Sequence, residues 1–171
     1  MMDWPRTTGK VLAWVGIAPF ILAVMAIFAH KIFALIGFVP IAGSIAELFV
    51  HVGDFIWPAL VVLISSYTAL IIAFIAGGQW TESAHLEQKS AAKFLWLSNF
   101  STLFAWFGML IPSWVISFSL LMLCLWLVYL VDFNLYQRGC WNKAYMKMRF
   151  GITLVVSICL LTLIFLGRPY F

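Results

Sequence analysis

Polar residues that could do chemistry gather where the apolar segments of this sequence end. The second apolar segment closes on a Gly-Gly-Gln-Trp run, the fourth closes on an aspartate, and the fifth opens beside an arginine. Near a membrane boundary an aspartate and an arginine can pair at lower cost than at the centre, and a glutamine amide can hydrogen-bond across helices. These residues form a candidate cluster on the inner face of a membrane: Gly77, Gly78, Gln79, Trp80, Asp132 and Arg149.

The candidate cluster has a structural interpretation and a functional one. In the structural interpretation, helix ends need caps, and charges mark where the membrane stops. The two glycines would then let a neighbouring helix approach closely. In the functional interpretation, the cluster lines a small pocket on the inner side, and polar residues near the start of the third apolar segment extend that pocket inward. Those residues are Ser98, Asn99, Ser101 and Thr102.

Two groups of acids and histidines have spacings that suit metal ligands. Glu47, His51 and Asp54 are spaced i, i+4, i+7, which places them on one face of a continuous helix. Glu82 and His85 are spaced i, i+3, as in the Glu-x-x-His motif of di-iron bundles. Such bundles need two of these motifs, and the topology below puts the two groups on opposite sides of the membrane. We therefore predict caps and head-group contacts here, with no metal site and no cofactor.

The composition identifies the solvent as lipid. Hydrophobic residues make up 65% of the 171 residues and charged residues 9%, whereas soluble domains are about half apolar and a quarter charged. Only one short basic loop is present, so we exclude a nucleic-acid partner. The three cysteines form no CxxC pair, which argues against a zinc site or a redox dithiol and predicts thiols that pack as small hydrophobes.

The lengths of the apolar segments predict the fold. A helix that crosses a membrane needs about 20 mostly apolar residues, and five segments meet this requirement or nearly so. They predict an all-α polytopic bundle, a single integral-membrane domain covering residues 1–171. The predicted spans are 11–29, 58–78, 94–111, 114–131 and 150–167. Pro112 and Ser113 predict a tight turn between the third and fourth spans, and Pro19 predicts a kink in the first.

A sixth apolar run, at 32–46, is shorter than a span and is interrupted by two glycines and a proline. These features favour a re-entrant or interfacial segment, which we extend over residues 32–52 of the first outer loop. Ser44 begins a capping-box pattern and predicts the start of a short helix, which Gly53 would end.

The positive charges predict the orientation. With five spans, eight of the ten lysines and arginines lie on one side, and positive residues favour the cytoplasmic side. The N-terminus is therefore expected inside and the C-terminus outside. The inner loop 132–149 mixes basic and aromatic residues, a pattern that attracts anionic lipid head groups, although topology-setting charge alone would explain it equally well. The candidates for head-group contact are Arg138, Lys143 and Lys147.

Four motifs, in order along the chain, carry a resemblance to a known family. They are GIAPF at 16–20, FIAGGQWT at 74–81, Asp132 closing the fourth span, and AYMKMRFGIT at 144–153. With these motifs the chain resembles the small membrane proteins grouped as domain of unknown function 3429, which include transmembrane protein 69. Gln79 stands where the family motif has a histidine, and an amide does not titrate, so proton transfer by that histidine is impossible here. The resemblance implies an integral protein of a bacterial inner membrane, or the mitochondrial equivalent, and brings no established activity.

Three kinds of function stay open at this point. A non-catalytic accessory or scaffold protein ranks first, binding lipid, a membrane protein partner or a second copy of itself, because the span interiors lack Asp, Glu, Lys, Arg and His. A small transporter or channel ranks second, because such proteins carry charged or broken helices near the midplane, and here only Pro19 breaks a span centrally. An enzyme acting on a lipid or a quinone ranks third, with Asp132, Glu82 and His85 as its acid–base candidates.

Overall fold

The fold is helical throughout the part of the chain that the structure describes. This computed structural model describes residues 14–36, 43–84 and 86–167, with the side chains of all these residues except 33–36, 43–56 and 88–90. The described ranges contain five long helices and no strand, as the all-α prediction requires. The helices are α2 (Ala18–Ile36), α3 (Gly43–Ser83), α4 (Gln88–Leu110), α5 (Trp114–Gln137) and α6 (Lys143–Leu166).

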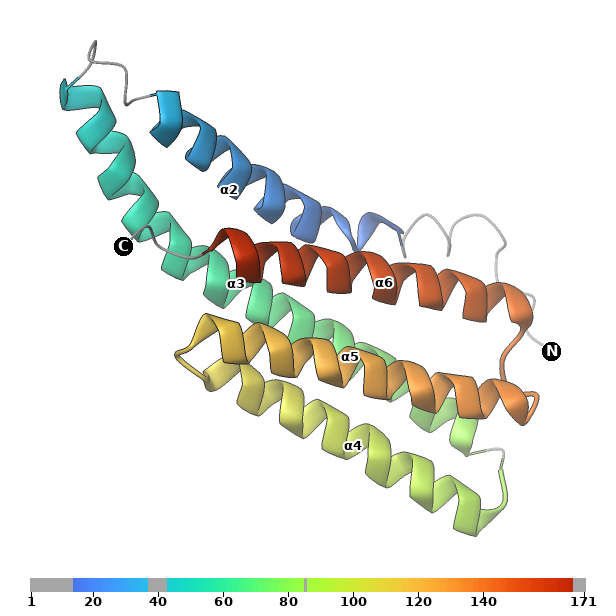
Figure 1. The fold of residues 1–171 in the computed structure, drawn as a ribbon. Coiled ribbons are helices and arrows are strands. Elements are labelled where there is room, and N and C mark those ends of the chain that lie inside the picture. Colours follow the sequence, from blue (N-terminus) through green and yellow to red (C-terminus); the bar gives the residue numbers. More distant parts are fainter. Residues whose placement is uncertain (1–13, 37–42, 85, 168–171) are drawn as a thin grey trace.

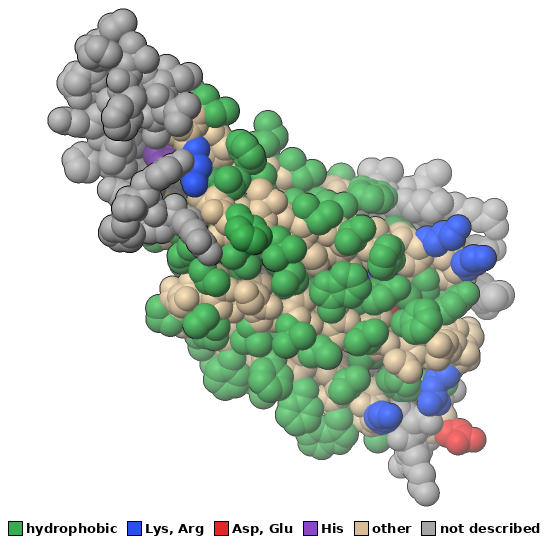
Figure 2. Space-filling view, viewed as in Figure 1, with side chains coloured by type: hydrophobic (Ala, Val, Ile, Leu, Met, Phe, Trp, Pro, Cys, Tyr) green, Lys and Arg blue, Asp and Glu red, His purple; other side chains and the backbone are tan. Residues whose placement is uncertain are grey.

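Successive helices run in opposite directions and lie side by side (Figure 1). The helix α5 packs against α3, α4 and α6, while α2 packs against α3 and α6. One end of the bundle therefore collects the end of α3, the start of α4, the end of α5 and the start of α6. Figure 2 shows Lys and Arg side chains gathered toward this end. We call it the basic end and define it by Lys93, Arg138, Lys143 and Lys147.

Among the residues whose side chains are described, three helical segments are long and apolar enough to cross a membrane: Trp57–Ser83, Trp114–Gln137 and Lys143–Leu166. The apolar stretch of α2, Ala18–Ile32, is shorter. The helix α4 is the least apolar of the five, since it carries lysine, asparagine, serine and threonine among its apolar residues. Length and composition thus give the protein a membrane character.

The first predicted span contains a break, next to the proline where a kink was predicted. Regular helix stops at Gly16 and Ile17 and starts again with α2, which places Pro19 in the first turn. Proline is tolerated there because its missing N–H has no helical partner to lose. The Phe20 N–H bonds to the Ile17 carbonyl, three residues back, and the Gly16 carbonyl accepts a hydrogen bond from the Tyr67 hydroxyl at 3.0 Å. A side chain of α3 therefore satisfies a backbone carbonyl that the break leaves without its helical partner.

The helix α3 corrects the prediction for the outer loop. It is a single helix of 41 residues, so Gly53 does not end a short helix and the helix of the second span begins well before residue 58. Glycine costs a helix interior only about 1 kcal/mol, which is too little to stop it. Pro58 has no N–H, and its ring crowds the carbonyl four residues earlier, which bends a helix without ending it. Figure 1 shows α3 bending between its teal start and its green end.

The length of α3 changes how the outer segment is understood. At 1.5 Å per residue it is roughly 60 Å long, about twice the hydrocarbon thickness of a bilayer. Its first part and the end of α2 extend past the other helices (Figure 1). Of the segment expected to be interfacial or re-entrant, residues 32–36 complete α2 and residues 43–52 begin α3. Residues 37–42 lie outside the described ranges.

The tight turn predicted at Pro112 and Ser113 is confirmed. The helix α4 ends at Leu110 and α5 begins at Trp114. The absence of a side chain at Gly108 lets α4 and α5 approach each other closely, since a Cβ added there would lie 3.3 Å from Leu120 Cδ2.

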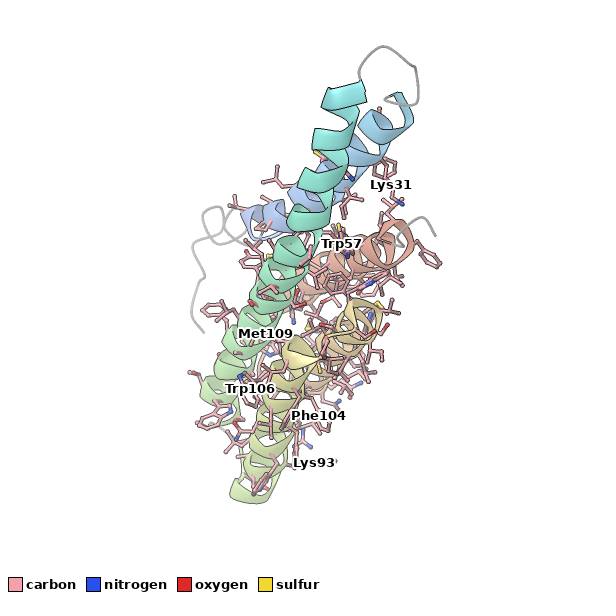
Figure 3. All side chains as sticks on the ribbon, turned by 90° about the vertical axis from the view of Figure 1, so that its left-hand side faces the viewer. Lys31, Trp57, Lys93, Phe104, Trp106 and Met109 are labelled. Atoms are coloured by element: carbon pink, nitrogen blue, oxygen red, sulfur yellow. The ribbon has the colours of Figure 1, made fainter. Side chains whose placement is uncertain are left out.

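The core has one large apolar cluster and one small one. The large cluster joins buried residues of all five helices, with Phe20, Phe118 and Leu160 among them, and Ala105 is the contribution of α4. The small cluster, Phe94, Val131 and Leu135, joins α4 to the end of α5. Many large apolar side chains also face outward, with Phe74 83% exposed, and Figure 2 shows such side chains spread over the visible face. Figure 3 places Lys31 near one end of the molecule and Lys93 near the other, so cations flank the apolar surface.

Candidate functional site

Asp132 is the centre of a buried polar cluster inside the basic end. It is fully buried on α5, which continues past the predicted end of the fourth span to Gln137. Arg149 lies inside α6, because that helix begins at Lys143 with the Asn142 side chain accepting a hydrogen bond from the Tyr145 N–H at 2.7 Å. The inner loop predicted over 132–149 is therefore only the short connection 138–142, and both charged residues sit on rigid helices.

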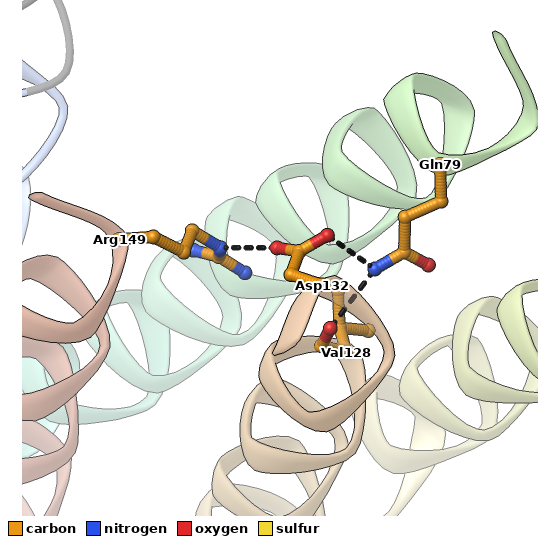
Figure 4. A network of polar contacts seen from close by, with 4 residues as sticks. All are labelled: Gln79, Val128, Asp132 and Arg149. Carbon is orange, nitrogen blue, oxygen red and sulfur yellow. Dashed lines mark hydrogen bonds and ion pairs between the residues drawn. The ribbon is translucent and has the colours of Figure 1, made fainter. Parts of the chain in front are cut away.

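Gln79 connects α3 to α5. Its side chain is 1% exposed, and its Nε2 donates two hydrogen bonds, each of 2.9 Å, to Asp132 Oδ1 and to the Val128 carbonyl (Figure 4). Val128 and Asp132 are four residues apart on α5, so they share a face of that helix. The carbonyl of Val128 has a second lone pair beyond the one used in the helix, and the amide occupies it.

Arg149 connects α6 to the other side of the same carboxylate. Its Nε donates to Asp132 Oδ2 at 3.0 Å, and the two side chains are 5% and 0% exposed. Asp132 thus accepts one hydrogen bond on each oxygen, from two different helices, as Figure 4 shows. The arrangement ties α3, α5 and α6 together at one point.

The energetics of this arrangement are asymmetric. A buried ion pair gains little relative to well-packed apolar residues, because both charges lose their hydration. Removal of one partner is costly, about 3–5 kcal/mol, because the other charge stays buried and unpaired. The cluster therefore penalises any packing of the three helices that separates Asp132 from Arg149.

Three polar atoms beside the ion pair have no hydrogen-bond partner among the described residues. They are Gln79 Oε1, Arg149 Nη2 and Thr153 Oγ1, and each is buried. Thr153 lies one turn after Arg149 on α6, so the polar interior continues along that helix. The Tyr145 side chain faces the same carboxylate from one turn before Arg149. Sequence reasoning missed Val128, Tyr145 and Thr153. The i±4 spacing from Arg149 could have indicated Tyr145 and Thr153.

Comparison of the sequence with known protein families identifies the family of this chain. The family model described as "Protein of unknown function (DUF3429)" matches residues 5–165. The chain belongs to this family. No curated protein and no solved structure matches it.

Not every residue of the candidate cluster comes together in this DUF3429 protein. Gly77 and Gly78 are exposed, and a Cβ added at either would meet nothing within 4 Å. The prediction that these glycines allow a close helix approach is therefore wrong. Trp80 is 47% exposed and lies outside the buried cluster. The helical rotation of about 100° per residue explains this, since it turns inward only Gln79 of the four.

The polar residues predicted to extend the cluster serve other contacts in this DUF3429 protein. The Ser98 hydroxyl donates to the Ala76 carbonyl at 3.0 Å and joins α4 to α3. Ser101 and Thr102 donate to carbonyls four residues earlier in their own helix, at 2.9 Å and 3.1 Å, the usual bond for such side chains in helices. Asn99 faces outward.

The three residues predicted to contact head groups are exposed at the basic end. Lys143 and Lys147 lie in the first two turns of α6. Arg138 follows α5, and its guanidinium lies over the Phe94 ring, 5.1 Å from the centroid. Arg138 therefore also holds the start of α4 against the end of α5.

The metal candidates lie mostly outside the described side chains. The backbone of Glu47, His51 and Asp54 belongs to α3, as a continuous helix requires, but their side chains are not described, and neither is His85. Among the described residues, no group of three His, Cys, Asp or Glu residues lies close enough to hold a metal ion.

The connection 138–142 carries Cys140, whose thiol pKa is raised above its usual value. Burial and the Glu82 carboxylate raise this pKa, and the Arg138 guanidinium partly offsets the increase.

Proposed function

We propose that this protein is a non-catalytic scaffold or accessory protein of a bacterial inner membrane, which binds lipid or a membrane partner. The observation that carries the proposal is the burial and hydrogen bonding of the Asp132 carboxylate. This carboxylate is fully buried, and both of its oxygens accept hydrogen bonds from the protein itself. A general acid or base must reach the proton that it transfers. A carboxylate held on both sides by Gln79 and Arg149 instead fixes three helices.

The outer surface supports the same proposal. Large apolar side chains face outward along the helices, for example Leu70 at 67% and Trp96 at 66% exposure. The buried hydroxyls of Thr68 and Ser157 are bonded to carbonyls of their own helices. A bundle with an apolar outside and internally bonded polar groups is what a lipid solvent requires.

The proposed topology has five spans with the basic end in the cytoplasm. Exposed lysines and arginines gather at one end of the bundle. At this end α3 and α5 finish, at Ser83 and Gln137, and α4 and α6 begin, at Gln88 and Lys143. Trp57 and Trp114 pack edge to face at the other end, with ring centroids 5.5 Å apart. Indoles at a helix end suit the outer membrane interface. Such a protein would present its basic end to cytoplasmic lipid head groups.

Purification tests the proposal most directly. The full chain is extracted from native membranes in a mild detergent, and its protein, lipid, metal and quinone contents are measured. A partner present in a fixed ratio, and recovered when the partner itself is tagged, supports a scaffold. A retained quinone or metal in a 1:1 ratio, lost with Asp132→Asn, would contradict it and point to catalysis.

A transport function is the second candidate, and one observation favours it. The buried atoms without partners, Gln79 Oε1, Arg149 Nη2 and Thr153 Oγ1, give the bundle a polar interior beyond the ion pair. Polar groups at membrane depth often mark a solute path. Solute and ion flux in liposomes decides the question. Flux above that of protein-free vesicles, and lost in Gln79→Ala, would favour transport; equal flux would leave the scaffold.

A further inference from the structure

A groove on the outer face of α4 is distinct from the buried cluster. It measures about 160 Å³ and is lined by Ala92, Leu95, Trp96 and Asn99. These residues recur at i, i+3, i+4 and i+7, so they form one face of the helix near its start. We call this feature the α4 groove. It opens outward, where the proposed topology places lipid.

Asn99 gives the α4 groove a polar wall. Its side chain is exposed, and it has no hydrogen-bond partner among the described residues. The side chains near it on the outer face, such as Trp96 and Leu103, are large and apolar. An amide that faces hydrocarbon without a partner is costly, because it has given up its bonds to water. A ligand that accepts from or donates to this amide therefore stabilises it.

Lys93 places a positive charge beside the α4 groove, next to its lining residue Ala92. It lies one residue after Ala92, and its side chain is exposed at the basic end (Figure 3). Trp96 lies beside it on the helix surface, and its ring is held by Phe100, with centroids 6.0 Å apart. A cation, an indole and an amide thus follow one another from the start of α4 toward its middle. A phospholipid presents a phosphate, ester groups and acyl chains in the same order from the surface inward.

We propose that the α4 groove binds one anionic phospholipid of the surrounding membrane. The Lys93 ammonium pairs with the lipid phosphate, the Asn99 amide hydrogen-bonds an ester carbonyl, and an acyl chain lies against Leu95 and Leu103. The inference rests on the membrane placement proposed above. It adds a defined site and a lipid class to the general attraction of head groups by Arg138, Lys143 and Lys147.

Charge favours a lipid over a second copy of the chain in this groove. Two copies related by a two-fold axis along the membrane normal, with their α4 grooves in contact, would bring two Lys93 side chains to the same edge of the interface. Like charges at that position repel, whereas a phosphate neutralises the lysine. Self-association through Asn99 is therefore the alternative outcome of the test.

Native mass spectrometry of the delipidated full-length protein tests the site. The protein is titrated with phosphatidylglycerol and with phosphatidylcholine carrying the same acyl chains. One phosphatidylglycerol is expected to bind first, roughly fivefold more tightly than phosphatidylcholine, the effect of one lysine on an anionic head group. Ala92→Phe fills the groove without entering the core, since Ala92 is exposed, and is expected to abolish this first binding event.

Matched variants separate the site from general charge. Lys93→Gln is expected to weaken the first phosphatidylglycerol roughly fivefold and to leave phosphatidylcholine unchanged. Lys31→Gln removes the same charge near the opposite end of the molecule and is expected to leave the first event unchanged. Equal affinities in Lys93→Gln and Lys31→Gln, or unchanged binding in Ala92→Phe, would overturn the proposal. Loss of a dimer in Asn99→Leu would assign the groove to a second copy instead.

The membrane placement has its own readout. Alkaline carbonate releases peripheral proteins from membranes and leaves integral ones in place. If the protein is released, the proposed function fails together with the lipid site. If it stays in the membrane but shows no groove-dependent lipid binding, only this inference fails.

Discussion

The carboxylate of Asp132 receives its two donors from opposite sides, and the two donors are not equivalent. Arg149 supplies the charge that offsets the buried carboxylate, while Gln79 supplies a neutral N–H that also bonds to the Val128 carbonyl. Loss of the charge leaves an unpaired ion in the interior, but loss of the amide leaves the ion pair intact. The two substitutions should therefore differ in cost.

Arg149→Leu is expected to lower the free energy of unfolding by about 3–5 kcal/mol, because it leaves Asp132 buried without a counter-charge. Gln79→Leu is expected to cost about 1.5–3 kcal/mol, the contribution of a hydrogen bond to a charged group. Asp132→Leu combined with Arg149→Leu should recover much of the loss, since an apolar pair needs no counter-charge. Thermal and chemical unfolding in detergent measures this cycle, and additive costs would show that the pair is not coupled.

Cys140 offers a titration on the short connection 138–142. Burial and the Glu82 carboxylate raise its thiol pKa, while Arg138 lowers it. The thiolate is the reactive form, so alkylation by a maleimide at neutral pH should be slower than for a free thiol and should rise as the pH approaches the raised pKa. Glu82→Gln removes one of the raising causes and should accelerate alkylation, whereas Arg138→Gln should slow it.

The alkylation experiment has internal controls. Cys124 and Cys159 are buried within helices, and Cys140→Ser reports any reaction at them. A rate that does not change with Glu82→Gln would contradict the assigned cause of the shift. A rate equal to that of a free thiol at every pH would contradict the shift itself.

At the scale of helices, the glycines divide into two kinds that the sequence alone does not separate. Gly108 lies at the α4–α5 contact, where an added Cβ would meet Leu120 at 3.3 Å, while Gly77 meets nothing within 4 Å. The pattern of adjacent glycines suggested a packing contact at Gly77, yet only the rotation of α3 determines which side faces a neighbour. The exposed position of Gly77 on α3 therefore has room for a larger residue, although the prediction placed a close helix contact there.

Alanine substitutions at these two glycines test the distinction. Gly77→Ala is expected to stabilise the protein by up to about 1 kcal/mol, because alanine favours helix and the added methyl meets open space. Gly108→Ala has the same helical gain but forces Leu120 to shift, so its net stabilisation should be smaller or absent. Melting temperatures of the two variants in one detergent compare them, and a larger gain for Gly108→Ala would contradict the packing described for α4 and α5.

The sequence predicted the helices better than their ends. Apolar length located all five helices, and Pro112 with Ser113 located the hairpin between α4 and α5. Hydropathy marks where an apolar stretch stops, but α5 and α6 continue as helices through polar residues to Gln137 and from Lys143. Gly53 failed as a stop signal because its cost in a helix is small compared with what the helix gains around it.

The candidate cluster could be predicted only in part, because the sequence shows charges but not the rotation of each helix. Asp132 and Arg149 have opposite charges near facing ends of consecutive segments, which indicates a pair. Gln79 was included as one of four consecutive residues, and its neighbours turn away from it on the helix. The Val128 carbonyl carries no sequence signature, since every residue has one. Its role follows only from the approach of α3 to α5.

At the scale of the whole molecule, the alternation of helix directions decides which segments share a compartment. The connections at 84–87 and 138–142 lie at the basic end, and the α4–α5 turn lies at the other (Figure 1). The topology proposed above would therefore place the first two on one side of the membrane and the third on the other. In that proposal the positive charges choose the cytoplasmic side for the basic end.

Labelling from each side of the membrane checks the proposed orientation. A membrane-impermeant maleimide is expected to label Cys140 in inside-out vesicles and not in spheroplasts. A cysteine introduced as Ser113→Cys, in the exposed turn between α4 and α5, should show the opposite pattern when Cys140 is replaced by serine. Labelling of both positions from the same side would contradict the bundle, and reversed labelling would contradict only its orientation.

The double donation by Gln79 has a consequence for which mutations the protein can accept. Both hydrogens of the amide point at oxygen atoms, one on Val128 and one on Asp132. Glutamate has the same shape and is one nucleotide away in the genetic code, but it would aim a third negative oxygen at two acceptors. One of the single-nucleotide changes at this codon is thus among the most harmful substitutions, although it hardly changes the volume of the side chain.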